Sequence, residues 1–250
     1  MFERVLAPIK AELQEAQNIL AKTYQIRAGH LGRFTRLIPG SFHDFIRPAL
    51  VLLSARIFAP LNSQAVALAA VIQFIYLAAR IHRNVRECAV PGDPKDGYQF
   101  PVLVGDYFYS RFFTCLCDHG VVKYLNPLSR IICEMSKGGI LRVQSGDGLQ
   151  NADLLKQIVF KETAILFGGG CRLAGDLAGA SEREQKALDR LGTSFGMAVG
   201  LSEYAQETNG YLGEALVALA GLPPGESRDT LEQLIRLFQK QNAGLAVQVG

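Results

Sequence analysis

Residues 160–181 read FKETAILFGGGCRLAGDLAGAS. Apolar and small residues recur in this stretch at helical spacing, and the three consecutive glycines at 168–170 lie inside that pattern. A glycine loop that binds a dinucleotide would instead follow a strand, so we interpret these glycines as a surface for close helix packing. The last residue, Ser181, begins the segment SEREQKALDRLG, in which Glu184 completes a capping box and predicts the start of the next helix.

The rest of the chain also carries helical periodicity, and strand signals are almost absent. The helix that begins at Ser181 is predicted to run to about Thr208, and its glycines at 192, 196 and 200 have the four-residue spacing that lets another helix pack closely. Pro48 can start a helix because its missing N–H has no partner there. Other helices are predicted at residues 2–27, 64–86 (after an Asn-Ser cap at 62–63), 102–119, 121–145, 151–179 and from the GLPPGES loop to about 241. We therefore predict a single all-α domain over residues 1–250.

Composition narrows the class of protein. The chain has 26 basic and 23 acidic residues without a basic stripe, so no nucleic-acid partner is indicated. Its five cysteines are odd in number and lack CxxC pairs, and its charged N-terminal segment does not resemble a signal peptide, which favours a reduced, cytoplasmic setting. The apolar run from Ala65 to Ala79 is about 15 residues long, short of the roughly 20 that span a membrane. We expect a buried core helix there and no transmembrane segment.

Motifs of the common enzyme classes are absent: there is no G-x-x-x-x-G-K-[ST], no G-x-S-x-G and no H-E-x-x-H. The order of several short segments is more informative. They are RP at 47–48, GDY at 105–107, TAILF at 163–167 and AGAS at 178–181. In that order and spacing the chain resembles the polyprenyl synthetases, the trans-isoprenyl diphosphate synthases, from about residue 2 to about residue 244. The resemblance implies a single isoprenoid-synthase-type helical bundle around a central cavity, with shortened C-terminal helices.

The chemistry of that family indicates which residues to look for. Its enzymes ionise an allylic diphosphate and add the resulting cation to isopentenyl diphosphate. Divalent metal neutralises the charge that develops on the departing diphosphate. In the family, two D-D-x-x-D motifs on facing helices hold Mg²⁺, because aspartates four residues apart lie on one helix face and supply hard oxygen ligands.

Both motifs are altered in this chain. The first aligns with RNVRE at 83–87, where Arg83 and Asn84 replace two aspartates and only Glu87 is acidic. A guanidinium cannot bind a cation, so half of the metal site is expected to be lost. The second aligns with EYAQE at 203–207, in which Glu203 and Glu207 are weak metal candidates or simply a solvated helix end. We expect no cofactor, and Mg²⁺ only if the chain is active.

The positions that bind diphosphate in the family are altered as well. The family pattern G-G-K-R-x-R-P aligns with FHDFIRP at 42–48, and its K-T aligns with ET at 162–163. The arginine pair expected after the first motif falls in CAVPGDPKDG, which has no arginine. The remaining candidates for diphosphate binding are Arg47, Arg83, Arg86 and Lys161. The candidates for lining the cavity are Tyr76, Ala78 and Ala79, although the two alanines could equally serve close helix packing.

Three hypotheses follow from the resemblance. The first is a non-catalytic or regulatory subunit that pairs with a catalytic prenyl synthase subunit or with a second copy of itself. The second is a metal-independent binder of a prenyl diphosphate or another anion, with Arg47, Arg83 and Arg86 in place of the metal charge. Against it, Arg83 and Arg86 could pair with Glu203 and Glu207 and close the mouth of the cavity. The third is an atypical active prenyltransferase that uses the remaining glutamates.

Overall fold

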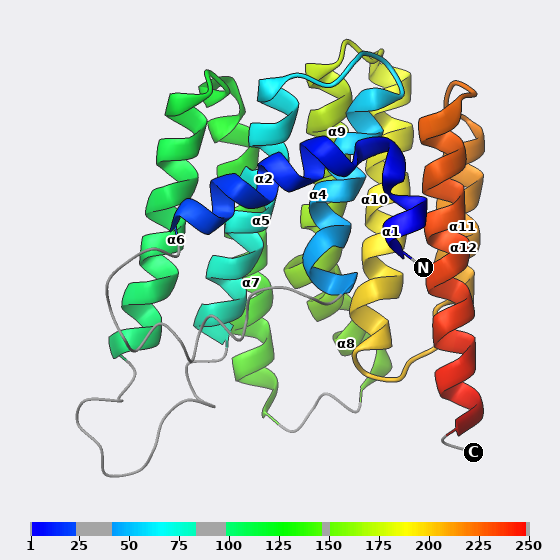
Figure 1. The fold of residues 1–250 in the computed structure, drawn as a ribbon. Coiled ribbons are helices and arrows are strands. Elements are labelled where there is room, and N and C mark those ends of the chain that lie inside the picture. The colour runs from blue at the N-terminus through cyan, green and yellow to red at the C-terminus, as the bar shows by residue number, and fades with distance from the viewer. Residues whose placement is uncertain (1, 24–41, 84–98, 147–150, 249–250) are drawn as a thin grey trace.

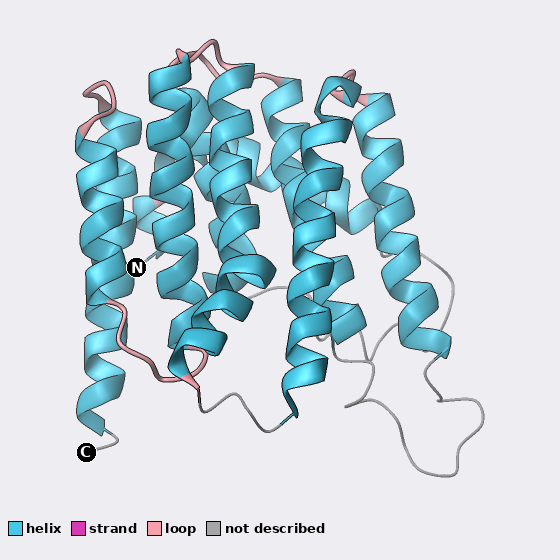
Figure 2. Ribbon diagram, turned by 180° about the vertical axis from the view of Figure 1, so that it is seen from behind, coloured by secondary structure: helices cyan, strands magenta, loops and turns pink. Residues whose placement is uncertain are grey.

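The computed structural model describes residues 2–23, 42–83, 99–146 and 151–248, and every regular element in these ranges is a helix (Figure 2). In chain order the elements are α1 (Phe2–Val5), η1 (Ala7–Ile9), α2 (Lys10–Thr23), α4 (Phe42–Arg56), α5 (Ser63–Arg83), α6 (Gln99–Asp118), η4 (Val122–Tyr124), α7 (Leu125–Ser145), α8 (Ala152–Val159), η6 (Phe160–Ala164), α9 (Ile165–Leu177), α10 (Glu182–Ser202), α11 (Asn209–Ala220) and α12 (Glu226–Gln248). The long helices stand side by side, and α2 crosses them on one side (Figure 1). The all-α helical bundle predicted from the sequence is confirmed.

Helix α5 forms the centre of the bundle. It packs against α2, α4, α6 and α9. The Asn62 side chain caps its start, because Oδ1 accepts a hydrogen bond of 2.9 Å from the backbone N–H of Ala65. The helix is long and apolar enough to cross a membrane by length and composition, but 78% of the tested window is buried inside the bundle. This burial agrees with the expected core helix.

The glycines of α9 and α10 bring these two helices into close contact. A Cβ atom added to Gly168 would lie 2.1 Å from Thr193 Oγ1. One added to Gly192 would lie 2.5 Å from the carbonyl oxygen of Phe167, and one added to Gly196 would lie 2.8 Å from a backbone Cα atom. Any side chain at these positions would push the helices apart, so the glycines serve helix packing as predicted.

Two predicted helix boundaries are wrong. The helix expected at 151–179 is divided into α8 and α9 by η6, a π-helical turn. Pro48 does not start a helix but lies within α4, which already begins at Phe42. Proline inside a helix removes one backbone hydrogen bond, and the helix continues because the residues on both sides of Pro48 are buried in the core.

A third difference affects the candidate site. Helix α10 ends at Ser202 rather than near Thr208, and α11, which was not predicted, follows from Asn209. The chain turns at Ala205, which has a left-handed φ of 53°. That conformation is unfavourable for a residue with a side chain. Glu203 and Glu207 therefore do not lie on one face of a continuous helix.

The turn at Ala205 gives a test of backbone strain. Ala205→Gly is expected to raise the free energy of unfolding by about 1 kcal/mol, because glycine adopts the left-handed region without a steric penalty. Urea denaturation followed by circular dichroism would measure the change. A variant that is less stable than the parent chain would contradict the φ angle assigned to this residue.

Candidate functional site

A cavity of about 550 Å³ lies between α5, α6, α7, η6 and the residue that follows α10. One part of its lining is apolar and comes mainly from α7, with Met135, Ile140 and Val143 and with Ala79 of α5. The other part is charged. Its charged residues are Arg80, Arg83, Arg142, Glu162 and Glu203. An apolar chamber with a few polar groups gathered on one side is typical of small-molecule sites.

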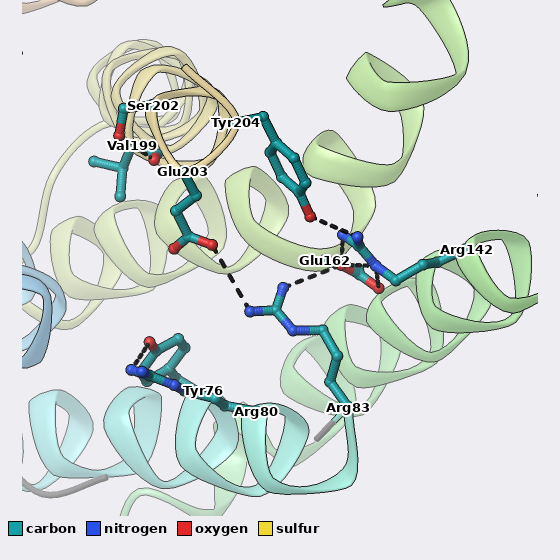
Figure 3. Close-up of polar contacts among 9 residues, drawn as sticks. All are labelled: Tyr76, Arg80, Arg83, Arg142, Glu162, Val199, Ser202, Glu203 and Tyr204. Carbon is teal, nitrogen blue, oxygen red and sulfur yellow. Dashed lines mark hydrogen bonds and ion pairs between the residues drawn. The ribbon is translucent and has the colours of Figure 1, made fainter. Parts of the chain in front are cut away.

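Four of these charged residues form one connected cluster with Tyr204 (Figure 3). The guanidinium of Arg142 donates to both carboxylate oxygens of Glu162 at 2.5–3.0 Å, and to the Tyr204 hydroxyl at 2.5 Å. Arg83 lies between two carboxylates, with Nη1 3.5 Å from Glu162 Oε2 and Nη2 3.7 Å from Glu203 Oε2. We call these five residues the mouth cluster. It joins α5, α7, η6 and the end of α10.

The centre of the mouth cluster is well shielded from water. The side chain of Glu162 is 10% exposed and that of Arg142 is 18% exposed. Forked hydrogen bonds between a guanidinium and a carboxylate are among the strongest polar contacts in proteins, and burial increases what is lost when one partner is removed. Two arginines face two glutamates here, so the cluster neutralises its own charge.

The local backbone explains how Glu162 reaches this position. It lies in η6, and π-helical turns redirect side chains within otherwise regular helices. Gly138 of α7 faces that turn, and a Cβ atom added to it would lie 2.8 Å from Lys161 Cβ and 2.9 Å from Glu162 Cγ. Helix α7 can therefore approach η6 closely enough for Arg142 to form its hydrogen bonds to Glu162.

The other candidate residues from the sequence are divided between several places. Tyr76 and Ala79 line the cavity, whereas Ala78 is fully buried in the core. Arg47 is 2% exposed and lies behind the cavity wall, with its Cζ atom 3.3 Å from the centroid of the Tyr76 ring. Lys161 forms an ion pair with Glu134 and does not line this cavity. Asn84, Arg86 and Glu87 lie outside the described residues.

The donor groups in the described region do not fit a Mg²⁺ site. Glu203 is paired with Arg83, and Glu207 accepts a 2.5 Å hydrogen bond from the backbone N–H of Asn209. Within the described ranges, no group of three or more His, Cys, Asp or Glu side chains could hold a metal ion. A hard divalent cation prefers several free oxygen ligands, and here an arginine stands beside the carboxylate.

Several residues of the site were not identified from the sequence, among them Glu162 at the centre of the mouth cluster. Arg142 and Tyr204 belong to the mouth cluster, and Arg80 lines the cavity one helical turn before Arg83. A signal for Arg142 exists, because it lies seven residues after Met135 and four after Gly138, both buried on α7. A charged residue on the buried face of a helix indicates a buried partner.

The bundle of helices around a cavity with a charged mouth agrees with the isoprenoid-synthase-type fold that the sequence resemblance implied. Residues 93–201 match the family model described as polyprenyl synthetase. The octaprenyl diphosphate synthase of Escherichia coli is 28% identical over 199 residues, which are 76% of this chain and 60% of that protein. Heptaprenyl diphosphate synthase component 2 of Geobacillus stearothermophilus is 25% identical over 199 residues, 77% of this chain and 62% of that protein. The chain thus spans less than two thirds of these relatives.

Solved structures show the same fold. A decaprenyl diphosphate synthase from Rhodobacter capsulatus superposes with a TM-score of 0.81 and 19% identity, over 95% of this chain and 98% of that chain. A heterotetrameric geranyl pyrophosphate synthase from mint, a deletion mutant with ligands, superposes with a TM-score of 0.70 and 22% identity, over 90% and 97% of the two chains. Together with the sequence matches, these findings support the predicted relationship: the chain is similar to the polyprenyl synthetases in sequence and has their fold.

Proposed function

We propose that the chain acts in isoprenoid biosynthesis as a polyprenyl diphosphate synthase-like subunit that does not catalyse the reaction on its own. One observation carries the proposal. Arg83 stands at the first position of the first motif and forms an ion pair with Glu203, which stands at the first position of the second motif. In the family, both positions bear the carboxylates that face the metal ions.

The charge of Arg83 opposes metal binding in two ways. The Arg83 guanidinium is paired with the Glu203 carboxylate, which a metal ion would need as a ligand. It also places a positive charge where a divalent cation would bind. Glu207, the other acidic residue of the second motif, caps the backbone at Asn209 instead. An active prenyltransferase would have to break these contacts and rely on Glu87, so we regard that hypothesis as the weaker one.

A protein partner is supported by helix α6. In the described part of the chain, α6 packs mainly on α5. Val102 and Phe113 are 40% and 49% exposed, and they lie on one face because eleven residues make about three turns. Exposed apolar side chains on one side of a helix can contribute to an interaction surface. The printed names "component 2" and "heterotetrameric" describe relatives that work in assemblies, and we propose a catalytic family member as the partner here.

The subunit role can be tested with a polyprenyl synthetase from the same source that keeps both D-D-x-x-D motifs. The two chains would be co-expressed with a tag on one of them, then assayed with farnesyl diphosphate, isopentenyl diphosphate and Mg²⁺. We expect co-purification and a change in the amount or length of the product relative to the partner alone. Phe113→Asp should prevent the association, whereas Val217→Asp, at another exposed apolar position on α11, should not. Failure of the two chains to co-purify, with unchanged product, would contradict the proposed role.

The second hypothesis, a metal-independent binder of an anion, is favoured by a different observation. The cavity of about 550 Å³ remains beside the mouth cluster, and Arg80 lines it. Ligand binding and a subunit role are compatible, since a partner subunit could hold a ligand without turning it over.

A further inference from the structure

Arg80 differs from the other two arginines of the cavity. Arg83 and Arg142 each face a glutamate of the mouth cluster. Arg80 donates from Nη1 to the Tyr76 hydroxyl at 2.8 Å (Figure 3), and no carboxylate of the described residues lies within ion-pair distance of it. His82 is directed to α6, where Nε2 lies 3.4 Å from Asp106 Oδ1. The described lining of the cavity therefore has an excess of one positive charge, located at Arg80.

Tyr76 provides a second donor beside that charge. Its hydroxyl oxygen accepts the hydrogen bond from Arg80, so the hydroxyl hydrogen remains available for an acceptor. Its ring is held in place by Arg47, which stacks on it at 3.3 Å from the centroid. A half-buried guanidinium next to a fixed hydroxyl is well suited to one carboxylate, which can accept from both groups at once.

The opposite wall of the cavity suits an apolar chain. Met135, Ile140 and Val143 line it from α7. Ile140 and Val143 are 57% and 54% exposed, so a ligand that covered them would bury apolar surface that now faces water. The cavity volume of about 550 Å³ is within the usual range of roughly 300–1,000 Å³ for sites that enclose small molecules.

A diphosphate fits this charge distribution poorly. The several negative charges of a diphosphate would lie beside Glu162 and Glu203. Of the arginines that line the described part of the cavity, only Arg80 does not already face a carboxylate. Binding through Arg142 would take the main cation away from buried Glu162, and binding through Arg83 would take it away from Glu203, which is unfavourable in both cases. A head group with one negative charge requires no such rearrangement.

We infer that the cavity binds an amphiphile with a single carboxylate head at Arg80 and Tyr76 and an apolar chain along α7, without a metal ion. This inference rests on the proposed non-catalytic role, because it assumes that the mouth cluster stays closed to metal-bound diphosphate. It assigns to the site a different ligand class from the substrates of the prenyl synthases.

Isothermal titration calorimetry in EDTA with three ligands of equal chain length tests the inference. Farnesoic acid is expected to bind at least tenfold more tightly than farnesyl diphosphate and farnesol. Arg80→Met and Tyr76→Phe should each weaken farnesoic acid binding at least tenfold. Arg130→Met should leave it unchanged, because Arg130 bonds to Asn126 on the exposed side of α7. Thermal melts would establish that each variant is folded, and Tyr76→Phe keeps the aromatic ring if Arg80→Met does not fold.

The outcomes separate this inference from the proposed function. Absence of farnesoic acid binding, tighter binding of farnesyl diphosphate in EDTA, or full affinity in Arg80→Met and Tyr76→Phe would each overturn the carboxylate site. A titration with dodecanoate would identify the kind of apolar chain that the cavity binds. An affinity equal to that of farnesoic acid supports a general aliphatic acid as the ligand, and a weaker affinity supports an isoprenoid acid. Mg²⁺-dependent turnover of farnesyl diphosphate would overturn the proposed function. A chain without turnover and without farnesoic acid binding would overturn the carboxylate site alone.

Discussion

Gly192→Ala is expected to lower the free energy of unfolding by about 3 kcal/mol, the upper part of the range for an overpacked core. The added Cβ atom would lie 2.5 Å from the carbonyl oxygen of Phe167 and 2.8 Å from the Cα atom of Gly168. Both are backbone atoms of α9, so the clash cannot be relieved by rotating a side chain. The helices must separate, and contacts along their shared face are lost.

Gly213→Ala is the matched control for Gly192→Ala. It also replaces a glycine within a helix, α11, but nothing lies within 4 Å of the added Cβ atom. Alanine has a higher helix propensity than glycine by about 1 kcal/mol, so this variant should be at least as stable as the parent chain. Urea denaturation of both variants would measure the difference, and equal stability of the two would contradict the close packing of α9 on α10.

Arg142→Met is the second substitution with a large expected effect. It should lower the free energy of unfolding by about 3 kcal/mol, because removing one partner of a buried ion pair leaves the other charge uncompensated. Glu162 would keep only Arg83, at 3.5 Å. The hydroxyl of Tyr204 would also lose its hydrogen bond from the guanidinium. The same urea measurement applies.

Two further variants distinguish burial of charge from a general effect of removing a cation. The double variant Arg142→Met/Glu162→Gln should recover much of the lost stability, because no unpaired charge remains in the cluster. Lys186→Met, which breaks an exposed ion pair to Glu182 on α10, should change stability by less than about 0.5 kcal/mol. A double variant as unstable as Arg142→Met would show that the forked contact is not what holds α7 against η6.

Much of the fold could be predicted because it depends on local patterns. Helical periodicity, the capping box at Ser181 and the four-residue spacing of glycines in α10 each have a direct structural meaning. The end of α10 could not be predicted, because the segment EYAQE at 203–207 contains no proline or glycine to stop a helix. The turn there depends on Ala205 in a left-handed conformation, which sequence preferences disfavour.

The candidate site could be predicted only in part. The pairing of Arg83 with Glu203 was one of the alternatives that the sequence left open, and the structure shows that contact. Glu207, the other proposed partner, caps Asn209 because the helix ends too early to hold it on the same face. The contact between Arg142 and Glu162 could not be predicted, because it depends on the π-helical turn of η6 and on how closely α7 packs there.

We propose that this chain, which is similar to the polyprenyl synthetases, has an internally neutralised cluster of charges where those enzymes bind metal ions. A cavity of about 550 Å³ lies beside this cluster, and it is compatible with both a subunit role and a ligand role. The apolar framework of α5, α9 and α10 depends on buried helix contacts rather than on these charged residues.

Incubation of the purified chain with farnesyl diphosphate, labelled isopentenyl diphosphate and Mg²⁺ over a wide range of metal concentrations tests the central claim most directly. We expect no labelled prenyl product above the level of a sample without protein, at any Mg²⁺ concentration, while a polyprenyl synthetase with both D-D-x-x-D motifs is active in parallel. Mg²⁺-dependent formation of product by this chain, abolished by Glu203→Gln, would contradict the central claim.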